Sequence, residues 1–212
     1  MVAHNFLWWD KDNNWSKSHN LCLEKCWWKI MIGMCRSPRR LGKHMSYISN
    51  VSGCISYYGV GTLTPIEGNM NTEKNISILG DNLWPIIARH FSNRFWIFQE
   101  DNTPCHVSVR ANQWKDENDI NCIPWSAQSP DLNIIENVWK VLKIQVQRRV
   151  NEIQNAQDLK RIVFDIWNSL PLHYARSLYA SLPRKIRYVL RSRGHISKYE
   201  KLWECKIFFY YK

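Results

Sequence analysis

The strongest constraint on the fold is a short apolar run that ends just before a carboxylate. Phe95 to Phe98 reads FWIF, and Asp101 lies just beyond it. A continuous apolar run of this length is typical of a buried strand in an α/β sheet, and such strands present side chains to ligands at their carboxyl ends. The sequence therefore predicts a strand at 95–99 with Asp101 at its terminus.

A second carboxylate, Glu136, opens a segment with helical periodicity. The turn-forming string Ser129-Pro130-Asp131 precedes it. Apolar residues that recur at three- and four-residue steps predict an amphipathic helix with Glu136 in its first turn. These residues are Ile135, Val138, Trp139, Leu142 and Val146.

Carboxylates at a strand end and a helix start can converge on one divalent cation. Mg²⁺ binds one or two such groups and completes its shell with water and substrate phosphate. The pair therefore favours metal-assisted phosphoryl transfer. Each residue alone also has a structural explanation, because Asp after a strand commonly forms a turn and Glu in a first turn meets the helix dipole favourably. Asp131 and Asn133 are further candidate ligands, although turn and cap chemistry explains them equally well.

The strings around the two carboxylates resemble the motifs of one family. FQEDNTPCH places Asn102, Pro104 and His106 after Asp101, and SAQSPDLNIIENVW ends its motif at Glu136. Across roughly residues 51 to 199, the chain resembles the Tc/mariner superfamily of DDE transposases. That resemblance implies an α/β, RNase H-like fold with a mixed five-stranded sheet flanked by helices.

The same resemblance implies metal-dependent DNA strand cleavage and transfer by a two-metal mechanism, with two Mg²⁺ or Mn²⁺ ions as cofactors. Asp10, Asp101 and Glu136 would be the catalytic carboxylates and the metal ligands. Asn102 and His106 would have a supporting role, such as orienting a ligand or a phosphate. The substrate would be double-stranded DNA, as transposon ends and target, in the nucleus, and the chain could act as a homodimer.

Asp10 is assigned to the first catalytic position by its place in the sequence. The apolar run Phe6-Leu7-Trp8-Trp9 precedes it. The family places its first carboxylate after such an opening strand, at a similar distance before the second. Asp12 is the nearest competitor, and Lys11 and Asp12 stand where the family usually has Glu followed by Ser or Thr.

Residues 13–50 depart from the family, because its Arg-Arg-Pro-Gly stretch and glycine-rich loop are missing. We expect a catalytic domain over 1–199, without the family's N-terminal helix-turn-helix modules, and an unexplained tail at 200–212. Two functions of different class are left open. One is an active DNA strand-transfer domain, and the other is a catalytically inactive remnant or co-opted DNA-binding protein.

The charge of the chain predicts a polyanionic partner. Its formal net charge is +11 and its pI is about 9.4. Each phosphate that Lys or Arg neutralises releases condensed counterions, so nucleic acid is the natural partner. The densest basic cluster supplies our predicted DNA contacts, with a solvated helix face as the alternative. These predicted contacts are Arg184, Lys185, Arg187, Arg191 and Arg193.

Composition fits a single globular domain, with 45% hydrophobic residues among 212. An apolar run long enough to span a bilayer, about eighteen residues, is missing from the sequence. The seven cysteines lack framework spacing, which indicates free thiols in a reducing compartment. A zinc site from His19, Cys22, Cys26 and Cys35 would lack the paired spacing of a closed tetrahedral centre.

Glycine, proline and capping residues predict the remaining elements. A hairpin around Gly59 and Gly61 should form an antiparallel sheet edge. Asn71 or Thr72 should cap a helix that Pro85 bends or ends. The other predicted elements are an opening strand at 5–9, a helix at 107–115, a strand at 120–123 and helices at 156–169 and 172–193.

Overall fold

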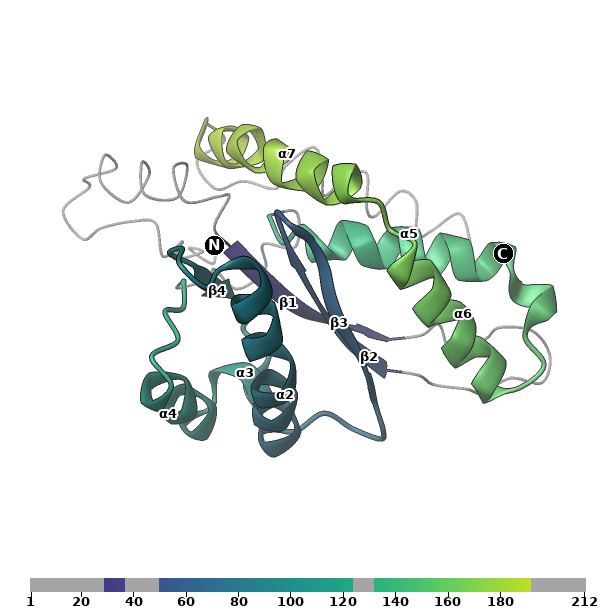
Figure 1. Ribbon diagram of the computed structural model, residues 1–212, viewed down its shortest axis with the longest axis horizontal. Helices are drawn as coiled ribbons and strands as arrows, with labels where there is room; N and C mark the ends of the chain where they lie inside the picture. Colours follow the sequence, from purple (N-terminus) through teal and green to yellow (C-terminus); the bar gives the residue numbers. More distant parts are fainter. Residues whose placement is uncertain (1–28, 37–49, 124–131, 192–212) are drawn as a thin grey trace, which may run out of the picture.

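The computed structural model of this chain describes residues 29–36, 50–123 and 132–191. Its helices and strands are arranged in layers around one mixed sheet (Figure 1). In chain order the elements are β1 (Lys29–Arg36), β2 (Asn50–Ser56), β3 (Gly59–Ile66), α2 (Thr72–His90), β4 (Ile97–Gln99), α3 (Pro104–Val107), α4 (Val109–Glu117), α5 (Ile135–Arg148), the 3₁₀ helix η2 (Val150–Glu152), α6 (Ala156–Asn168) and α7 (Leu172–Arg191).

The sheet has the strand order β3-β2-β1-β4. β1, β2 and β3 pair antiparallel, whereas β4 runs parallel to β1. The predicted mixed α/β sheet is therefore confirmed, but the described residues contain four strands rather than five. Where a strand was predicted at 120–123, the structure has only a single parallel bridge between Phe98 and Cys122.

β1 is a strand that the sequence analysis did not predict. It lies within residues 13–50, the stretch that departs from the family, and it pairs with both β2 and β4. Ile30 stands opposite Ser56 on one side and Phe98 on the other. The predicted opening strand at 5–9 lies outside the described residues, so β1 is the strand beside β4 in this structure.

The predicted hairpin is confirmed as β2 and β3, joined by a turn at Tyr57 and Tyr58. Gly59 has a φ of 121°, a backbone conformation that residues with a Cβ atom rarely adopt. This residue lets the chain turn back directly into β3. β3 lies at the edge of the sheet, as expected.

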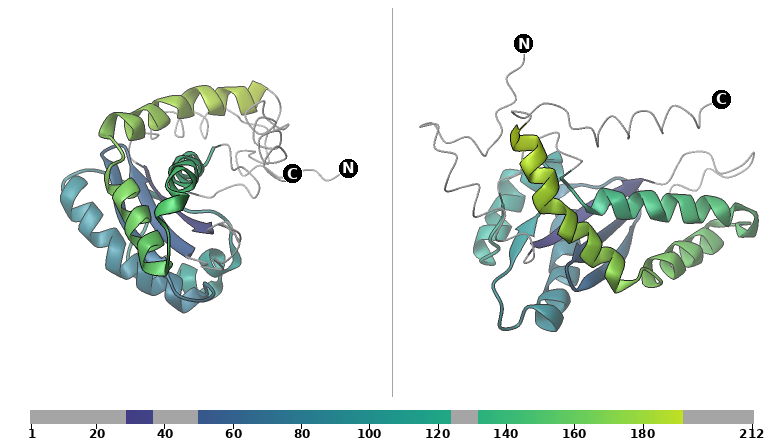
Figure 2. Two further views of the ribbon diagram at one scale, coloured as in Figure 1. Left: turned by 90° about the vertical axis from the view of Figure 1, so that its right-hand side faces the viewer. Right: turned by 90° about the horizontal axis from the view of Figure 1, so that it is seen from above.

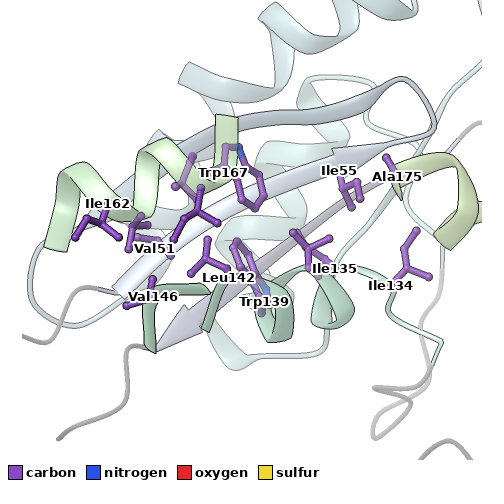
Figure 3. Close-up of a cluster of buried hydrophobic side chains, with 14 of the residues drawn as sticks. Val51, Ile55, Ile134, Ile135, Trp139, Leu142, Val146, Ile162, Trp167 and Ala175 are labelled. Atoms are coloured by element: carbon purple, nitrogen blue, oxygen red, sulfur yellow. The ribbon is translucent and has the colours of Figure 1, made fainter. Parts of the chain in front are cut away.

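One face of the sheet is covered by α5, α6 and α7, which share the larger hydrophobic core (Figures 1 and 2). The predicted apolar stripe of α5 is buried in that core. Trp139 of α5 stacks on Trp167 of α6 with ring centroids 5.2 Å apart (Figure 3). Both rings lie over Gly53 in β2, so the absence of a side chain there is what admits them.

The opposite face is covered by α2, which packs Leu79 and Leu83 against Phe98 in a second core. Asn71 caps α2 by accepting a hydrogen bond from the Lys74 amide at 2.9 Å. Pro85 lies inside α2, which continues to His90 and is therefore not ended by it.

The helix predicted at 107–115 is two helices, because Ser108 breaks the run. Ser108 then caps α4 by accepting from the Ala111 amide at 3.2 Å. The helices predicted at 156–169 and 172–193 correspond to α6 and to α7 as far as Arg191. Within the described ranges, none of the helices is sufficiently long and apolar to cross a membrane.

Candidate active site

Asp101 follows the end of β4, as the apolar run predicted. Its side chain is 42% exposed, whereas its hydrogen-bond partner His106 is almost completely buried. The short helix α3 begins at Pro104, next to Thr103, and brings His106 back against Asp101. The strand end and the helix start therefore form one compact unit around this carboxylate.

Two hydrogen bonds hold Asp101 in one orientation. Its Oδ1 accepts the Thr103 amide at 3.1 Å and lies 2.7 Å from Nδ1 of His106. Burial alone would raise the pKa of Asp101, but the bonds from His106 and Thr103 outweigh it and lower the pKa to about 2. Asp101 is therefore ionised at neutral pH, which is the state that a metal ligand requires.

The contact with Asp101 gives His106 a pH-dependent contribution to stability. Burial opposes its charged form, but the Asp101 hydrogen bond and the charges of Glu100 and Asp101 raise the His106 pKa above 6.5. A raised folded-state pKa stabilises the fold fully below the unfolded value, and this stabilisation is lost as pH rises through the folded pKa. We expect His106→Gln to lower the urea midpoint more at pH 5.5 than at pH 9, as followed by circular dichroism. An equal loss at both pH values would contradict the charged His106–Asp101 pair.

A buried ion pair lies on the other side of the β4 end. Glu100 directly follows β4, and its side chain faces Lys115 of α4. Its Oε1 accepts from Nζ of Lys115, and the same Nζ donates to the His106 carbonyl at 3.0 Å. Both side chains are buried, at 7% and 5% exposure. Lys115 therefore connects Glu100, the residue before Asp101, to the backbone of His106, whose side chain orients Asp101.

Glu136 lies in the first turn of α5, where the helical pattern predicted it. Its pKa is raised, first by burial and then by the negative charge of Asp101, while Lys143 opposes both. The charge of Asp101 thus acts on Glu136, the other predicted carboxylate. In the described part of the chain, however, no three His, Cys, Asp or Glu residues gather closely enough to hold a metal.

Comparison with known proteins identifies the family of this chain. Residues 42–160 match the family model described as DDE superfamily endonuclease. That match covers more than half of the chain and includes both carboxylates. The chain belongs to the DDE superfamily endonucleases.

Relatives of this DDE chain are transposases of nematodes. It is 33% identical to the Tcb1 transposase of Caenorhabditis briggsae over 74% of this chain and 56% of that protein. It is 28% identical to the Tc1 transposase of Caenorhabditis elegans over 82% of this chain and 63% of that protein. The chain thus spans somewhat more than half the length of these relatives, and the Tc/mariner resemblance is confirmed.

Solved structures confirm the fold of the DDE domain. The catalytic domain of Mos1 mariner transposase superposes with a TM-score of 0.70, over 85% of this chain and 92% of that one, at 13% identity. A Mos1 paired-end complex with the left transposon end gives the same TM-score over 84% of this chain. The RNase H-like architecture predicted from the two motifs is therefore correct.

The other residues predicted for the DDE site differ in their exposure or lie outside the described part of the chain. Asn102 is exposed directly after Asp101, and Asn133 is buried just before α5. Asp10, Asp12 and Asp131 lie outside the described residues. The catalytic and metal-binding roles of Asp10, Asp101 and Glu136 and the supporting roles of Asn102 and His106 stay predictions.

The predicted DNA contacts on α7 do not all face outward. Arg184, Arg187 and Arg191 are exposed, whereas Arg193 lies outside the described residues. Lys185 is 7% exposed, and its Nζ lies 3.4 Å from Oδ1 of Asn137 in α5. Lys185 thus faces the residue after Glu136, and the three exposed arginines are the better candidates for phosphate contacts.

Sequence reasoning missed the pair of Glu100 and Lys115. One signal was present, because Glu100 directly follows the buried strand β4. A second signal was the spacing of Lys115, four residues after the buried Ala111 on the inward face of α4. Neither signal identifies the partner, since the contact joins two elements 15 positions apart.

Proposed function

We propose that this chain is a transposase catalytic domain that cleaves and joins DNA strands with divalent metal ions. The observation that carries the proposal is Asp101, whose carboxylate is held in one orientation beyond the end of β4 by Thr103 and His106. Membership of the DDE superfamily and the relatives' transposase names support the same reaction.

The residues present fit a hard divalent cation. Asp101 offers partly exposed carboxylate oxygens, and the raised pKa of Glu136 reflects burial and a like charge that a cation would offset. Structures of the Mos1 transposase catalytic domain have been solved with Mg and with Mn. Asp101, Glu136 and, by its place in the sequence, Asp10 would hold the ions, of which we propose two. Such ions, when bound, make a nucleophile from water or a hydroxyl and neutralise the leaving oxygen.

The protein's own contribution is to fix the carboxylates before metal arrives. His106 and Thr103 hold Asp101 in one orientation, so little reorganisation is needed on binding. Lys115 fixes the backbone at His106 from the other side. The first turn of α5 then sets the position of Glu136 relative to Asp101.

Duplex DNA is the proposed substrate, as transposon ends and target. We also propose that the chain acts in the nucleus. Mos1 transposase has been solved in a paired-end complex with the left transposon end and in a strand transfer complex. The exposed arginines of α7 and the net charge of +11 support a polyanionic partner here. A homodimer belongs to the same proposal.

One observation favours the alternative, a catalytically inactive DNA-binding remnant. β1, the strand beside β4, has the sequence KIMIGMCR and contains no carboxylate. A three-carboxylate centre therefore depends on Asp10 or Asp12. Metal binding by variants of these residues separates the two functions.

The direct test is Mn²⁺-dependent nicking of supercoiled plasmid by the purified chain. We expect Asp101→Asn to slow nicking about a hundredfold or more, because loss of even an outer partner of a metal ligand typically costs 10- to 100-fold. Asp116→Asn, an exposed change on α4, should leave the rate unchanged. Nicking that persists in Asp101→Asn would indicate a contaminating nuclease.

Calorimetric titration of Mn²⁺ separates loss of activity from loss of the site. Binding weakened in each of Asp10→Asn, Asp101→Asn and Glu136→Gln would support a three-carboxylate centre. If the folded wild type binds no Mn²⁺, with or without DNA, the remnant function is favoured instead.

A further inference from the structure

A group of aromatic and basic side chains surrounds the turn between β2 and β3. Its members come from the turn, from the end of α2 and its following loop, and from the first half of α7. We call it the tyrosine–arginine cluster, and it consists of Tyr57, Tyr58, His90, Arg94 and Arg176.

Tyr58 is the centre of one half of the cluster. The His90 ring stacks on it nearly parallel, at 9°, with centroids 5.6 Å apart. The guanidinium of Arg94 lies 5.1 Å from the centroid of the same ring, and its Nη1 donates to the Tyr58 hydroxyl. Phe91 meets Tyr58 edge-on and anchors it to the core. The arginine is therefore held at the surface by an anchored ring.

Tyr57 is the centre of the other half. Arg176 of α7 lies 5.3 Å from its ring centroid. The ring also meets Tyr179 edge-on, and the Tyr179 hydroxyl donates to the carbonyl of Ile55 at 2.9 Å. Figure 1 shows the hairpin turn close beneath α7. Both arginines are thus positioned on aromatic rings, which lowers the entropy lost when they bind a ligand.

The charges of both arginines are available to an outside anion. Arg94 and Arg176 are exposed, and neither forms an ion pair with a carboxylate of the described residues. By contrast, Arg110 pairs with Glu73, and Arg161 with Asp158 and Asp165. The hairpin, the loop at 91–96 and all of α7 contain no Asp or Glu.

Arg176 also lies in line with the exposed arginines of α7. Steps from 176 to 184, 187 and 191 follow helical spacing, which places these residues along one face of α7. The stripe extends for about 22 Å at 1.5 Å per residue. A polyanion that follows α7 would therefore reach the hairpin turn.

We propose that the tyrosine–arginine cluster is a contact site for the phosphate backbone of duplex DNA, separate from the catalytic carboxylates. The inference rests on the proposed DNA-binding function and adds a specific surface to it. The sheet register supports the separation, because Ser56, next to the turn, is level with Phe98 in β4 through Ile30. Asp101 lies beyond the opposite end of β4, about 10 Å further along the strand direction.

The test is the salt dependence of binding to a 30-bp duplex, measured by fluorescence anisotropy. Each phosphate contact contributes about 0.9 to the slope of log K against log salt. Arg94→Ala/Arg176→Ala should therefore make this dependence shallower, reducing the magnitude of the slope by about two. It should also weaken binding at 50 mM salt by about tenfold or more. The matched control, Arg110→Ala/Arg161→Ala, removes the same charge from ion-paired surface positions and should keep the wild-type slope.

A charge-preserving variant separates contact from folding. Arg94→Lys/Arg176→Lys should keep the wild-type salt slope, because lysine also contacts phosphate, but it should bind more weakly because lysine is not held on the rings in the same way. Thermal unfolding should report a folded protein. Equal slopes for the alanine variant and the wild type would overturn the cluster as a DNA contact, and so would a folded lysine variant that has the slope of the alanine one. A wild type that binds no DNA would instead refute the proposed DNA-binding function itself.

Discussion

Lys115→Met should lower the free energy of unfolding by about 3–5 kcal/mol. Lys115 and Glu100 are buried at 4% and 8% residue exposure, so their charges have little access to water. Removing one partner of a buried ion pair leaves an uncompensated charge, which costs far more than the pair itself contributes. Oε2 of Glu100 already has no hydrogen-bond partner in the described structure, so the charge of His106 and the hydrogen bond and charge of Lys115 are what offset its burial. Urea unfolding followed by circular dichroism measures the loss.

A double variant provides the matched control. In Glu100→Gln/Lys115→Met both charges are gone, so we expect it to be more stable than Lys115→Met alone. The pKa of Glu100 is raised by burial even in the presence of Lys115. Protonation should therefore reduce the cost of Lys115→Met at pH 5 relative to pH 8. A double variant as unstable as the sum of its single changes would show that packing, and not charge, is what Lys115 contributes.

The same lysine connects stability to the candidate active site. Its Nζ also donates to the His106 carbonyl at 3.0 Å, and His106 orients Asp101. Loss of Lys115 therefore removes support from α3 as well as from β4. This arrangement places a buried charge pair at the end of β4, where two short elements with little core of their own must be held together.

The sequence predicted the parts of the site that depend on local pattern. Asp101 follows an apolar run, and Glu136 opens a helix whose apolar period survives unchanged in the fold. Both positions carry family motifs, which predict roles for them that periodicity alone cannot. Asn71 as a cap was equally local, since it bonds an amide three residues away.

The parts that the sequence did not predict depend on distant partners. β1 contains the apolar run Ile30 to Cys35, followed by the turn-forming Ser37-Pro38. Such a run does not by itself identify its neighbours, and the place of β1 is set by pairing with β2 and β4. Lys185 belonged to a basic run that looked exposed, yet Asn137 of another helix receives its side chain. Composition records the charge of such a residue, but only packing determines whether that charge meets solvent.

Gly53 and Trp139 are a pair whose fit only the fold could show. A Cβ on Gly53 would lie 2.6 Å from Cη2 of Trp139 and 2.8 Å from Cη2 of Trp167. Both tryptophans are 1% exposed and stack on each other. The two rings therefore fill the space that glycine leaves, and this contact fixes the helices α5 and α6 on the sheet.

Trp139→Ala should accordingly cost about 3–5 kcal/mol, because a large buried ring is replaced by a cavity beneath Trp167. Trp139→Phe should cost much less, since Nε1 of Trp139 has no hydrogen-bond partner in the described structure and its loss leaves no polar group unpaired. Gly53→Ala should destabilise the wild type by about 1–3 kcal/mol through overpacking. The same change should cost less in Trp139→Phe, where the nearest clashing atom is gone. Urea unfolding of the wild type, Gly53→Ala, Trp139→Phe and the double variant Gly53→Ala/Trp139→Phe measures this coupling. Strictly additive costs would mean that the sheet moves at Gly53 rather than the ring.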